Sequence, residues 1–289
     1  IGLVTDAIWS DVDNDKRSEL LLTLDWGGIE ILKWNGKQWA KQVQSLQKQI
    51  GWWNSIQAVD IDKDGDLDYV AGNYGGNGFL QASPDKPVQV YAKDFDNNGS
   101  FDAVFTHTEL DQIGGKEREV ILAGRDEFIR EMTPFKEKFP NYSSYAKADL
   151  KTLFTEAQRK DALHIQATQF ASVWIENKGH FEFVTHPLPS MAQFAPIYGI
   201  VAQDVNADGY PDLILNGNEF AMAPYLGRND AFNGLVLLGN GKSFRPLTPA
   251  QSGFFVPGNG KSLITLKIGT KSALIAAQNG GMLKVYQLK

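Results

Sequence analysis

The sequence predicts an all-β fold, namely a β-propeller with about four or five recognisable blades, complete or part of a larger ring, and with an α-helical insertion. Two observations lead to this prediction. An acidic loop of nine residues recurs along the chain between short apolar runs that have the composition of β-strands. In addition, residues 1–13 align without gaps on residues 50–62, so the chain repeats at an offset of 49 residues. With 289 residues, of which 43% are hydrophobic, the chain can bury the core of one propeller.

Three copies of the acidic loop are complete, at residues 60–68, 94–102 and 204–212. Each has oxygen-bearing side chains at loop positions 1, 3, 5 and 9 and a glycine at position 6, as Ca²⁺ requires in a sharply turning loop. A weaker copy at residues 11–19 has Lys16 in place of the glycine and Glu19 in place of the last aspartate. We therefore expect three or four structural Ca²⁺ ions. The predicted ligands are Asp11, Asp13, Asp15, Glu19, Asp60, Asp62, Asp64, Asp68, Asp94, Asp96, Asn98, Asp102, Asp204, Asn206, Asp208 and Asp212.

Two other interpretations of the loops, an EF-hand and a metal-free turn, fit the sequence less well. An EF-hand loop closes with a glutamate at position 12 and lies between two helices, whereas position 12 here is Ala71, Phe105 or Leu215, within a strand-like run. A metal-free acidic turn needs only one or two of these residues. Four ligand positions at fixed offsets, repeated three times with the same flanking strands, favour metal binding.

The loop pattern and its flanking strands resemble the FG-GAP/VCBS repeats of the integrin α-subunit propeller and of bacterial cell-surface proteins related to cartilage acidic protein. The resemblance covers essentially the whole chain. Segments 72–75, 87–94 and 227–231 are similar to those of long, multi-repeat proteins of Bacteroidetes-type bacteria. This resemblance implies that each acidic loop joins the first two strands of a blade and binds Ca²⁺.

The blade plan of this family implies an order of elements over a propeller region that spans residues 1–289. The first blade covers residues 1–49, with strands near 19–24, 28–34 and 38–43, and the second starts near Trp52. The third starts at Val88, is interrupted after Thr106 and resumes at 171–176 and 180–185. The fourth runs from Ile197 to about Pro246. A last unit has strands at 263–267, 273–277 and 283–287 without an acidic loop.

The interruption, residues 108–166, is expected to be an α-helical insertion within the third blade. Residues 125–132 have helical spacing of apolar positions, and Pro134 ends or restarts that helix. Ser143 or Ser144 could cap a second helix that continues through Phe154. Residues 155–158 have the form of a capping box that opens a third. The insertion either covers one face or edge of the sheets or forms part of a binding surface.

Composition and charge restrict the partners and the location that we expect for the protein. The formal net charge is −6, and four divalent ions would bring it to +2, so the acidity is largely explained by metal ligation. Nucleic acid is not an expected partner, because acidic residues outnumber Lys and Arg and no basic stripe is present. No apolar run is long enough to cross a membrane. The chain opens in mid-repeat, so we expect further domains of a longer protein. Loops of this kind need near-millimolar calcium, which predicts an extracellular, periplasmic or outer-membrane surface location in a bacterium.

No catalytic constellation is visible. The four histidines form no recognisable pattern and cysteine is absent, so the question of enzymatic activity stays open while a non-catalytic role is favoured. Residues that follow the second strand of each blade could together line a ligand face: Trp26, Asn73, Tyr74, His107, Asn218 and Glu219, with Arg228 and Asp230 from the next loop. The predicted function is a calcium-stabilised binding or adhesion module for a protein or glycan ligand. The alternatives are a polysaccharide-active enzyme domain and a purely architectural segment.

Overall fold

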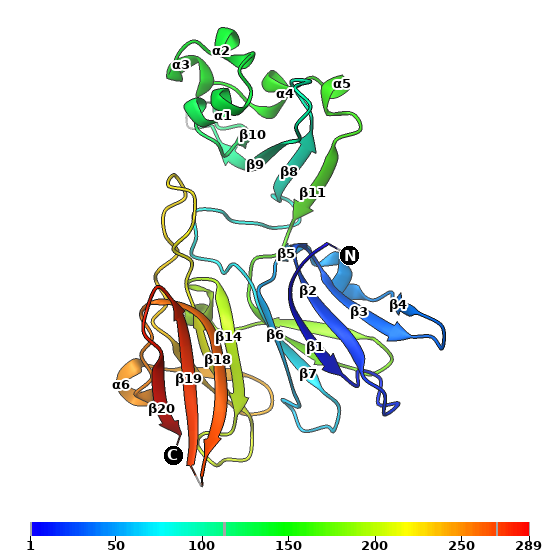
Figure 1. Cartoon of the computed structure of the whole chain (residues 1–289), viewed down its shortest axis with the longest axis vertical. Helices are drawn as coiled ribbons and strands as arrows, with labels where there is room; N and C mark the ends of the chain where they lie inside the picture. Colours follow the sequence, from blue (N-terminus) through cyan, green and yellow to red (C-terminus); the bar gives the residue numbers. More distant parts are fainter. Residues whose placement is uncertain (1, 112–113, 270, 289) are drawn as a thin grey trace. The chain divides into compact units, whose positions relative to one another are not determined.

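The computed structural model describes residues 2–111, 114–269 and 271–288 (Figure 1). Ile1, with which the 49-residue repeat begins, lies outside the described residues. The chain forms two compact units, one from residues 1–79 and 169–289 and the other from residues 80–168. No helix in the described ranges is both long and apolar enough to span a membrane.

The first unit consists of four antiparallel sheets. The first sheet has the order β1 (Leu3–Ser10), β2 (Glu19–Gly27), β3 (Ile29–Trp34) and β4 (Trp39–Lys41), and β5 (Gly51–Trp52) also pairs with β2. The second has β6 (Ser55–Val59), β7 (Asp68–Gly72), β12 (Val173–Asn177) and β13 (Phe183–Pro187). The third has β14 (Ile197–Gln203), β15 (Asp212–Gly217), β16 (Leu235–Gly239) and β17 (Phe244–Leu247), and the fourth has β18 (Asn259–Ile268), β19 (Lys271–Asn279) and β20 (Lys284–Leu288).

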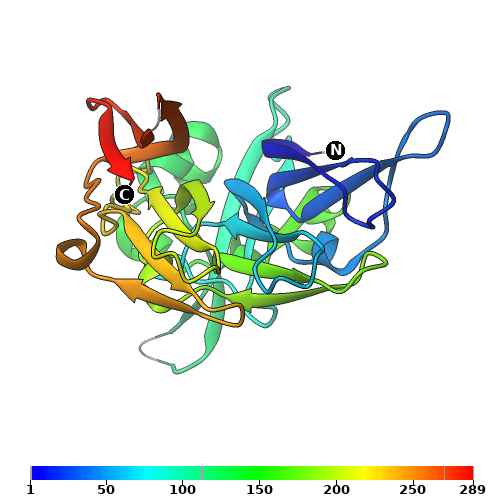
Figure 2. The same cartoon turned by 90° about the horizontal axis from the view of Figure 1, so that it is seen from below.

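These sheets stack in chain order, as propeller blades do. Their first strands, β1, β6, β14 and β18, lie beside one another in succession. Figure 2 shows the same succession as a change of colour from blue to red. Apolar side chains from neighbouring sheets share buried clusters. One contains Leu21 of the first sheet and Tyr69 of the second, another Val70 of the second and Leu213 of the third, and a further one Ile214 of the third and Leu274 of the fourth. The predicted all-β, propeller-type fold is confirmed, and the sheets are not closed into a ring.

The central strands of the stack are the most deeply buried. All five residues of β7 and all six of β15 are buried, because each of these strands has sheet neighbours on both sides and a packed sheet on each face. Their sequences are accordingly short apolar runs without alternation. Each begins at the ninth residue of an acidic loop, Asp68 or Asp212, so the loops are attached directly to the most deeply buried strands of the unit.

Short helices connect some strands of the first unit. The 3₁₀ turns η1 (Ser45–Lys48) and η2 (Ser190–Gln193) follow β4 and β13, respectively. The helix α6 (Pro249–Ser252) follows β17, and Thr248 caps it by accepting a hydrogen bond from the Gln251 N–H.

The second unit has one four-stranded sheet and a helical segment. The sheet has the order β10 (Glu117–Ile121), β9 (Asp102–Leu110), β8 (Val88–Lys93) and β11 (Leu163–Ala167). The helices are α1 (Arg125–Glu131), α2 (Phe135–Lys138), α3 (Tyr142–Tyr145), α4 (Leu150–Leu153) and α5 (Glu156–Arg159). Phe128, Leu150 and Phe154 from the helical segment pack on Tyr91 and Val104 of the sheet. The helices therefore cover one face of this sheet.

The strands predicted at 171–176 and 180–185 do not belong to the third blade, so this prediction is wrong. β12 pairs with β7 in the register Val173↔Ala71 and Ile175↔Tyr69, so β12 and β13 complete the second sheet. The sequence pattern could not reveal this pairing, because about a hundred residues separate the two strands and any apolar strand can form the same ladder hydrogen bonds. Burial of Val173 and Ile175 against the first sheet decides the partner.

The expected helices are only partly correct. α1 and α5 form at the predicted places, and Thr155 and Gln158 make the expected capping box at α5. One continuous helix from Ser143 or Ser144 to Phe154 is wrong. Two single-turn helices form instead, because Asn141 caps α3 and Asp149 caps α4, and Asp149 starts a new helix where the predicted one would have continued.

Candidate functional site: four acidic loops and the opposite strand ends

The four acidic loops share one backbone conformation. The residue at position 4 has a positive φ in every loop: Asn14 59°, Lys63 64°, Asn97 59° and Ala207 60°. Position 6 does as well: Lys16 69°, Gly65 102°, Gly99 90° and Gly209 92°. Lys16 thus adopts the left-handed conformation that glycine adopts elsewhere, at a cost of about 1 kcal/mol. The weaker loop retains the turn despite losing its glycine.

The loops also share their internal hydrogen bonds. The carboxylate at position 1 accepts from the N–H at position 6 in three loops: Asp11 from Lys16 at 2.8 Å, Asp94 from Gly99 at 2.9 Å and Asp204 from Gly209 at 2.8 Å. The side chain at position 5 accepts from the N–H at position 7 in all four, at Asp15, Asp64, Asn98 and Asp208. These bonds turn the side-chain oxygens toward the inside of each loop.

The carboxylate at position 9 joins the loop to the sheet. One of its oxygens accepts from the N–H at position 2 in every loop: Glu19 from Val12, Asp68 from Ile61, Asp102 from Phe95 and Asp212 from Val205, at 2.8 to 3.0 Å. The second oxygen of Asp68 accepts from the Asn177 N–H at 2.9 Å, and that of Asp212 from the Gly239 N–H at 2.8 Å. Asp68 and Asp212 therefore connect the loop to both the second and third strands of their sheets.

Carboxylates crowd together in three loops. One oxygen from each of three aspartates lies within 4.8 Å of the others in the sets Asp11, Asp13, Asp15; Asp60, Asp62, Asp68; and Asp94, Asp96, Asp102. In the second loop, burial raises the pKa of the Asp62 carboxyl and raises that of Asp68 to about 6, and neighbouring carboxylates contribute to both. A divalent cation among these oxygens would offset both the burial and the repulsion.

The donor sets of the loops at 60–68, 94–102 and 204–212 fit Ca²⁺, because they consist of oxygen atoms from carboxylates and amides on a loop that turns around a common centre. In the fourth loop, Asn206 Nδ2 donates to Asp208 at 2.8 Å, so these two side chains lie side by side. The first loop differs, since Lys33 of β3 makes ion pairs with Asp13, with Asp15 at 2.8 Å and with Glu19 at 3.4 Å.

Two residues of the predicted ligand face are buried and bind the backbone instead. Asn73 is 0% exposed: its side chain accepts from the Trp52 and Tyr74 N–H groups and donates to the Gln169 carbonyl at 2.9 Å. Asn218 is likewise 0% exposed, accepts from the Phe232 N–H and donates to two carbonyl oxygens. Both side chains hold the loops that follow β7 and β15, which leaves them no free group for a ligand.

Trp26 and Tyr74 are brought together by two aromatic residues that the sequence analysis did not single out. Trp52 lies 5.2 Å from Trp26 and 5.0 Å from Tyr74, and Phe170 packs on both Trp52 and Tyr74. Tyr74 is 4% exposed, whereas Trp26 is half-buried. Of the two predicted aromatic contacts, Trp26 is therefore the accessible one.

Glu219 belongs to a polar cluster that includes two further unpredicted residues. It accepts hydrogen bonds from Tyr198 Oη at 2.8 Å and from Lys261 Nζ at 2.6 Å, and Lys261 Nζ lies 3.5 Å from the centre of the Tyr198 ring. Although burial opposes it, these bonds lower the pKa of the Glu219 carboxyl. Asp25 also acts electrostatically on Tyr198, and burial raises the pKa of Asp25.

The remaining predicted contacts are more exposed or lie in the second unit. Arg228 and Asp230 are exposed, and the Arg228 guanidinium lies 5.3 Å from the centre of the Phe220 ring. His107 is part of the second unit, where it lies 3.2 Å from Glu109, and burial lowers its pKa. Of the predicted ligand-face residues in the first unit, Trp26 and Glu219 are half-buried and Arg228 and Asp230 are exposed.

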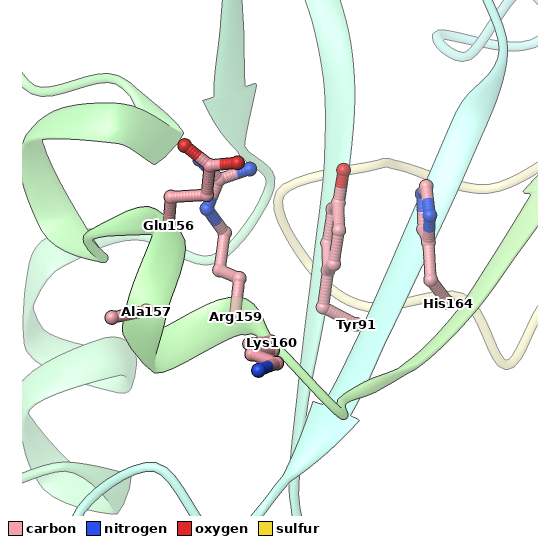
Figure 3. Close-up of a pocket in the computed structure, with 6 residues that line it drawn as sticks. All are labelled: Tyr91, Glu156, Ala157, Arg159, Lys160 and His164. Atoms are coloured by element: carbon pink, nitrogen blue, oxygen red, sulfur yellow. The ribbon is translucent and has the colours of Figure 1, made fainter.

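Two surface features are not predicted by the repeat pattern. In the second unit, a pocket is lined by Tyr91, Glu156, Ala157, Arg159, Lys160 and His164, and the rings of Tyr91 and His164 stack at 4.2 Å (Figure 3). In the first unit, Trp9, Trp34 and Trp39 form an exposed aromatic row, with ring centres 5.4 and 5.6 Å apart and exposures of 60%, 44% and 44%. Pairing of β3 with β4 places Trp34 opposite Trp39, and Trp9 of β1 reaches Trp39 across the folded sheet, so linear spacing could not have revealed the row.

Comparison with known proteins supports the repeat assignment. Residues 11–71, which contain the first two acidic loops, match the model of an FG-GAP-like repeat. No curated protein matches the chain. Fourteen solved chains do, among them one described as the crystal structure of BBS1N in complex with ARL6DN, soaked with mercury. That chain is 13% identical, and the alignment covers 100% of this chain and 80% of that chain with a TM-score of 0.27, which is too low to support any argument about function.

Proposed function

We propose that this protein is a calcium-stabilised binding module that acts outside the cytoplasm, at a bacterial cell surface or in the periplasm, on a protein or glycan ligand. The observation that carries the proposal is the acidic loop, which recurs with the same turn, the same internal hydrogen bonds and an all-oxygen donor set in both units. FG-GAP repeats are found in integrin-like adhesion and binding modules, which is consistent with this role.

The calcium ions would stabilise the fold and would take no part in catalysis. In the second sheet, Asp68 accepts a hydrogen bond from the backbone of Asn177 in β12. In the third sheet, Asp212 accepts one from the backbone of Gly239 in β16. An ion held by the same loop would neutralise the crowded carboxylates and make the sheet edge more rigid. The ligands that would hold it are Asp60, Asp62, Asp64 and Asp68 in one loop and their counterparts in 94–102 and 204–212.

Chelation should therefore lower thermal stability. We expect EDTA to decrease the melting temperature by about 5 to 10 °C relative to millimolar Ca²⁺, since a site saturated a hundredfold above its dissociation constant adds about 2.7 kcal/mol and 1 kcal/mol corresponds to about 2 to 4 °C for a unit of this size. Differential scanning fluorimetry measures the shift, with Mg²⁺ as the control ion. An unchanged melting temperature would remove calcium from the proposal.

The accessible part of the ligand face is the proposed binding surface. Aromatic rings and charged side chains at the ends of strands suit the stacking and hydrogen bonding by which proteins bind sugars and polar peptides. We expect Trp26→Ala and Arg228→Ala each to weaken binding about tenfold on a glycan array or to a purified partner. Arg228→Ala should leave the melting temperature unchanged, whereas Trp26→Ala should lower it slightly, because the contact with Trp52 is lost.

A matched control is available in the same sheet. Trp9→Ala removes another accessible tryptophan, which belongs to the exposed row with Trp34 and Trp39. Binding should be unaffected by this substitution. If Trp9→Ala abolishes binding and Trp26→Ala does not, the ligand binds to the tryptophan row and the proposed face is wrong. If the bound glycan is hydrolysed, as release of reducing ends would show, the module is an enzyme domain.

A further inference from the structure

The first acidic loop differs from the others in its relation to a basic side chain. Lys33 Nζ contacts Asp13 and lies 2.8 Å from Asp15 and 3.4 Å from Glu19, so it touches the side chains at loop positions 3, 5 and 9 at once. These are three of the four positions expected to hold Ca²⁺. Ca²⁺ binds its oxygen ligands at about 2.3 to 2.6 Å and an ammonium group cannot share that space. The first loop does not fit Ca²⁺ while Lys33 is in this position.

The position of Lys33 is set by strand pairing. The register Leu20↔Leu32 between β2 and β3 places Lys33 opposite Glu19, the ninth residue of the loop. The same position in the second sheet is Glu176, opposite Asp68, and in the third sheet it is Leu238, opposite Asp212. Neither can supply a positive charge. Among the ion pairs between described residues, those made by predicted loop ligands all involve Lys33.

The environment of Lys33 holds its ammonium group at the loop. The side chain is 24% exposed, and its Nζ lies 5.7 Å from the centre of the Phe181 ring, which comes from the neighbouring sheet. Asp13 also has a different hydrogen-bond partner from the residues at position 3 of the other loops. In the other loops the side chain at position 3 accepts from the N–H at position 5, whereas Asp13 Oδ2 faces Lys33.

Charge at the turn also differs. Positions 6 and 7 of the first loop are Lys16 and Arg17, whereas the second loop has Gly65 and Asp66. The hydrogen bond from Lys33 lowers the pKa of the Asp15 carboxyl, and Arg17 contributes. The loop is therefore already supplied with positive charge by its own chain. One oxygen of Asp13, Oδ1, is buried without a hydrogen bond to the described residues, and such an oxygen could also bind an ion. A count of bound ions therefore decides between a loop filled by Lys33 and a loop that binds Ca²⁺.

We propose that the Lys33 ammonium group takes the place of Ca²⁺ in the first loop, so that this sheet is fastened without metal while the other three loops bind Ca²⁺. The second half of this statement rests on the proposed function; the first half does not. In the wild-type protein the first loop should remain folded in EDTA.

The test is calcium stoichiometry by equilibrium dialysis, together with melting temperature, for the wild-type chain and Lys33→Leu. Leucine is the residue that the third sheet has at this position. The wild type should bind three ions and Lys33→Leu four. In EDTA the variant should melt about 5 °C lower than the wild type, because its carboxylates are then uncompensated, and Ca²⁺ should restore most of the loss. Lys41→Leu is the matched control, since Lys41 pairs with Glu30 in the same sheet at 3.0 Å, away from the loop, and should leave the ion count at three.

Two results would overturn the inference. One is a Lys33→Leu protein that binds no more ions than the wild type. The other is a wild-type protein whose ion count falls by one on Asp13→Asn, because that would show Ca²⁺ in the first loop, and this measurement stands even if Lys33→Leu does not fold. If the wild type binds no Ca²⁺ and Lys33→Leu binds one ion, the result supports the proposal that the Lys33 ammonium group takes the place of Ca²⁺ in the first loop. The same result contradicts the proposal that the other three loops bind Ca²⁺.

Discussion

Replacing Asp68 with alanine is expected to lower the free energy of unfolding of the first unit by about 3 kcal/mol or more, even without calcium. The carboxylate is 1% exposed and accepts from the Ile61 and Asn177 N–H groups at 3.0 and 2.9 Å. Hydrogen bonds to a charged group contribute about 1.5 to 3 kcal/mol each, and both N–H groups would be left unpaired. With Ca²⁺ present the loss should be larger, because a ligand is removed as well.

Urea denaturation followed by tryptophan fluorescence measures this effect selectively. The seven tryptophans, at positions 9, 26, 34, 39, 52, 53 and 174, belong to the first unit, so the signal does not include unfolding of residues 80–168. Asp66→Ala is the control in the same loop. Among the described residues, no backbone N–H donates to the Asp66 side chain, whereas two donate to Asp68, and burial and the neighbouring Asp64 raise the pKa of the Asp66 carboxyl to about 7, so its removal should cost little. Equal losses for the two variants would contradict the fastening role of position 9.

The second large effect is expected at Asn218. Alanine there removes two hydrogen bonds to the carbonyl oxygens of Phe232 and Gly258 and one from the Phe232 N–H, all in a side chain that is 0% exposed. Its φ of 89° also suits asparagine better than alanine. We expect a loss of about 3 to 4 kcal/mol in the free energy of unfolding, measured by the same fluorescence assay.

Asn73→Ala should behave in the same way, since Asn73 holds Trp52 and the Gln169 carbonyl. Asn77→Ala provides the control, because Asn77 is exposed and its side chain makes a single long hydrogen bond, of 3.4 Å, to the described part of the chain. If Asn73→Ala and Asn218→Ala left stability unchanged and abolished ligand binding, these residues would belong to the ligand face and would not hold the loops.

Local features of this fold could be predicted because they depend on neighbouring residues. Gly65, Gly99 and Gly209 mark left-handed turns, and the apolar runs that begin after Asp68 and Asp212 are short, bounded and contain β-branched or aromatic residues, which favours strands. The ligand face could not be predicted as well. Asn73 and Asn218 have the polar character expected of a binding residue, and only burial shows that the backbone uses all of their hydrogen bonds.

The sequence by itself determined the short strands, the four acidic loops and the repeat that stacks them, since each follows from residue types at fixed local spacing. Tertiary structure alone decided that β12 completes the second sheet, that Trp52 and Phe170 join Trp26 and Tyr74, and that Lys33 reaches the first loop. The physical reason is that strands pair through backbone groups that all residues share. The choice among distant partners is therefore made by the burial of whole sheet faces, which no short segment records.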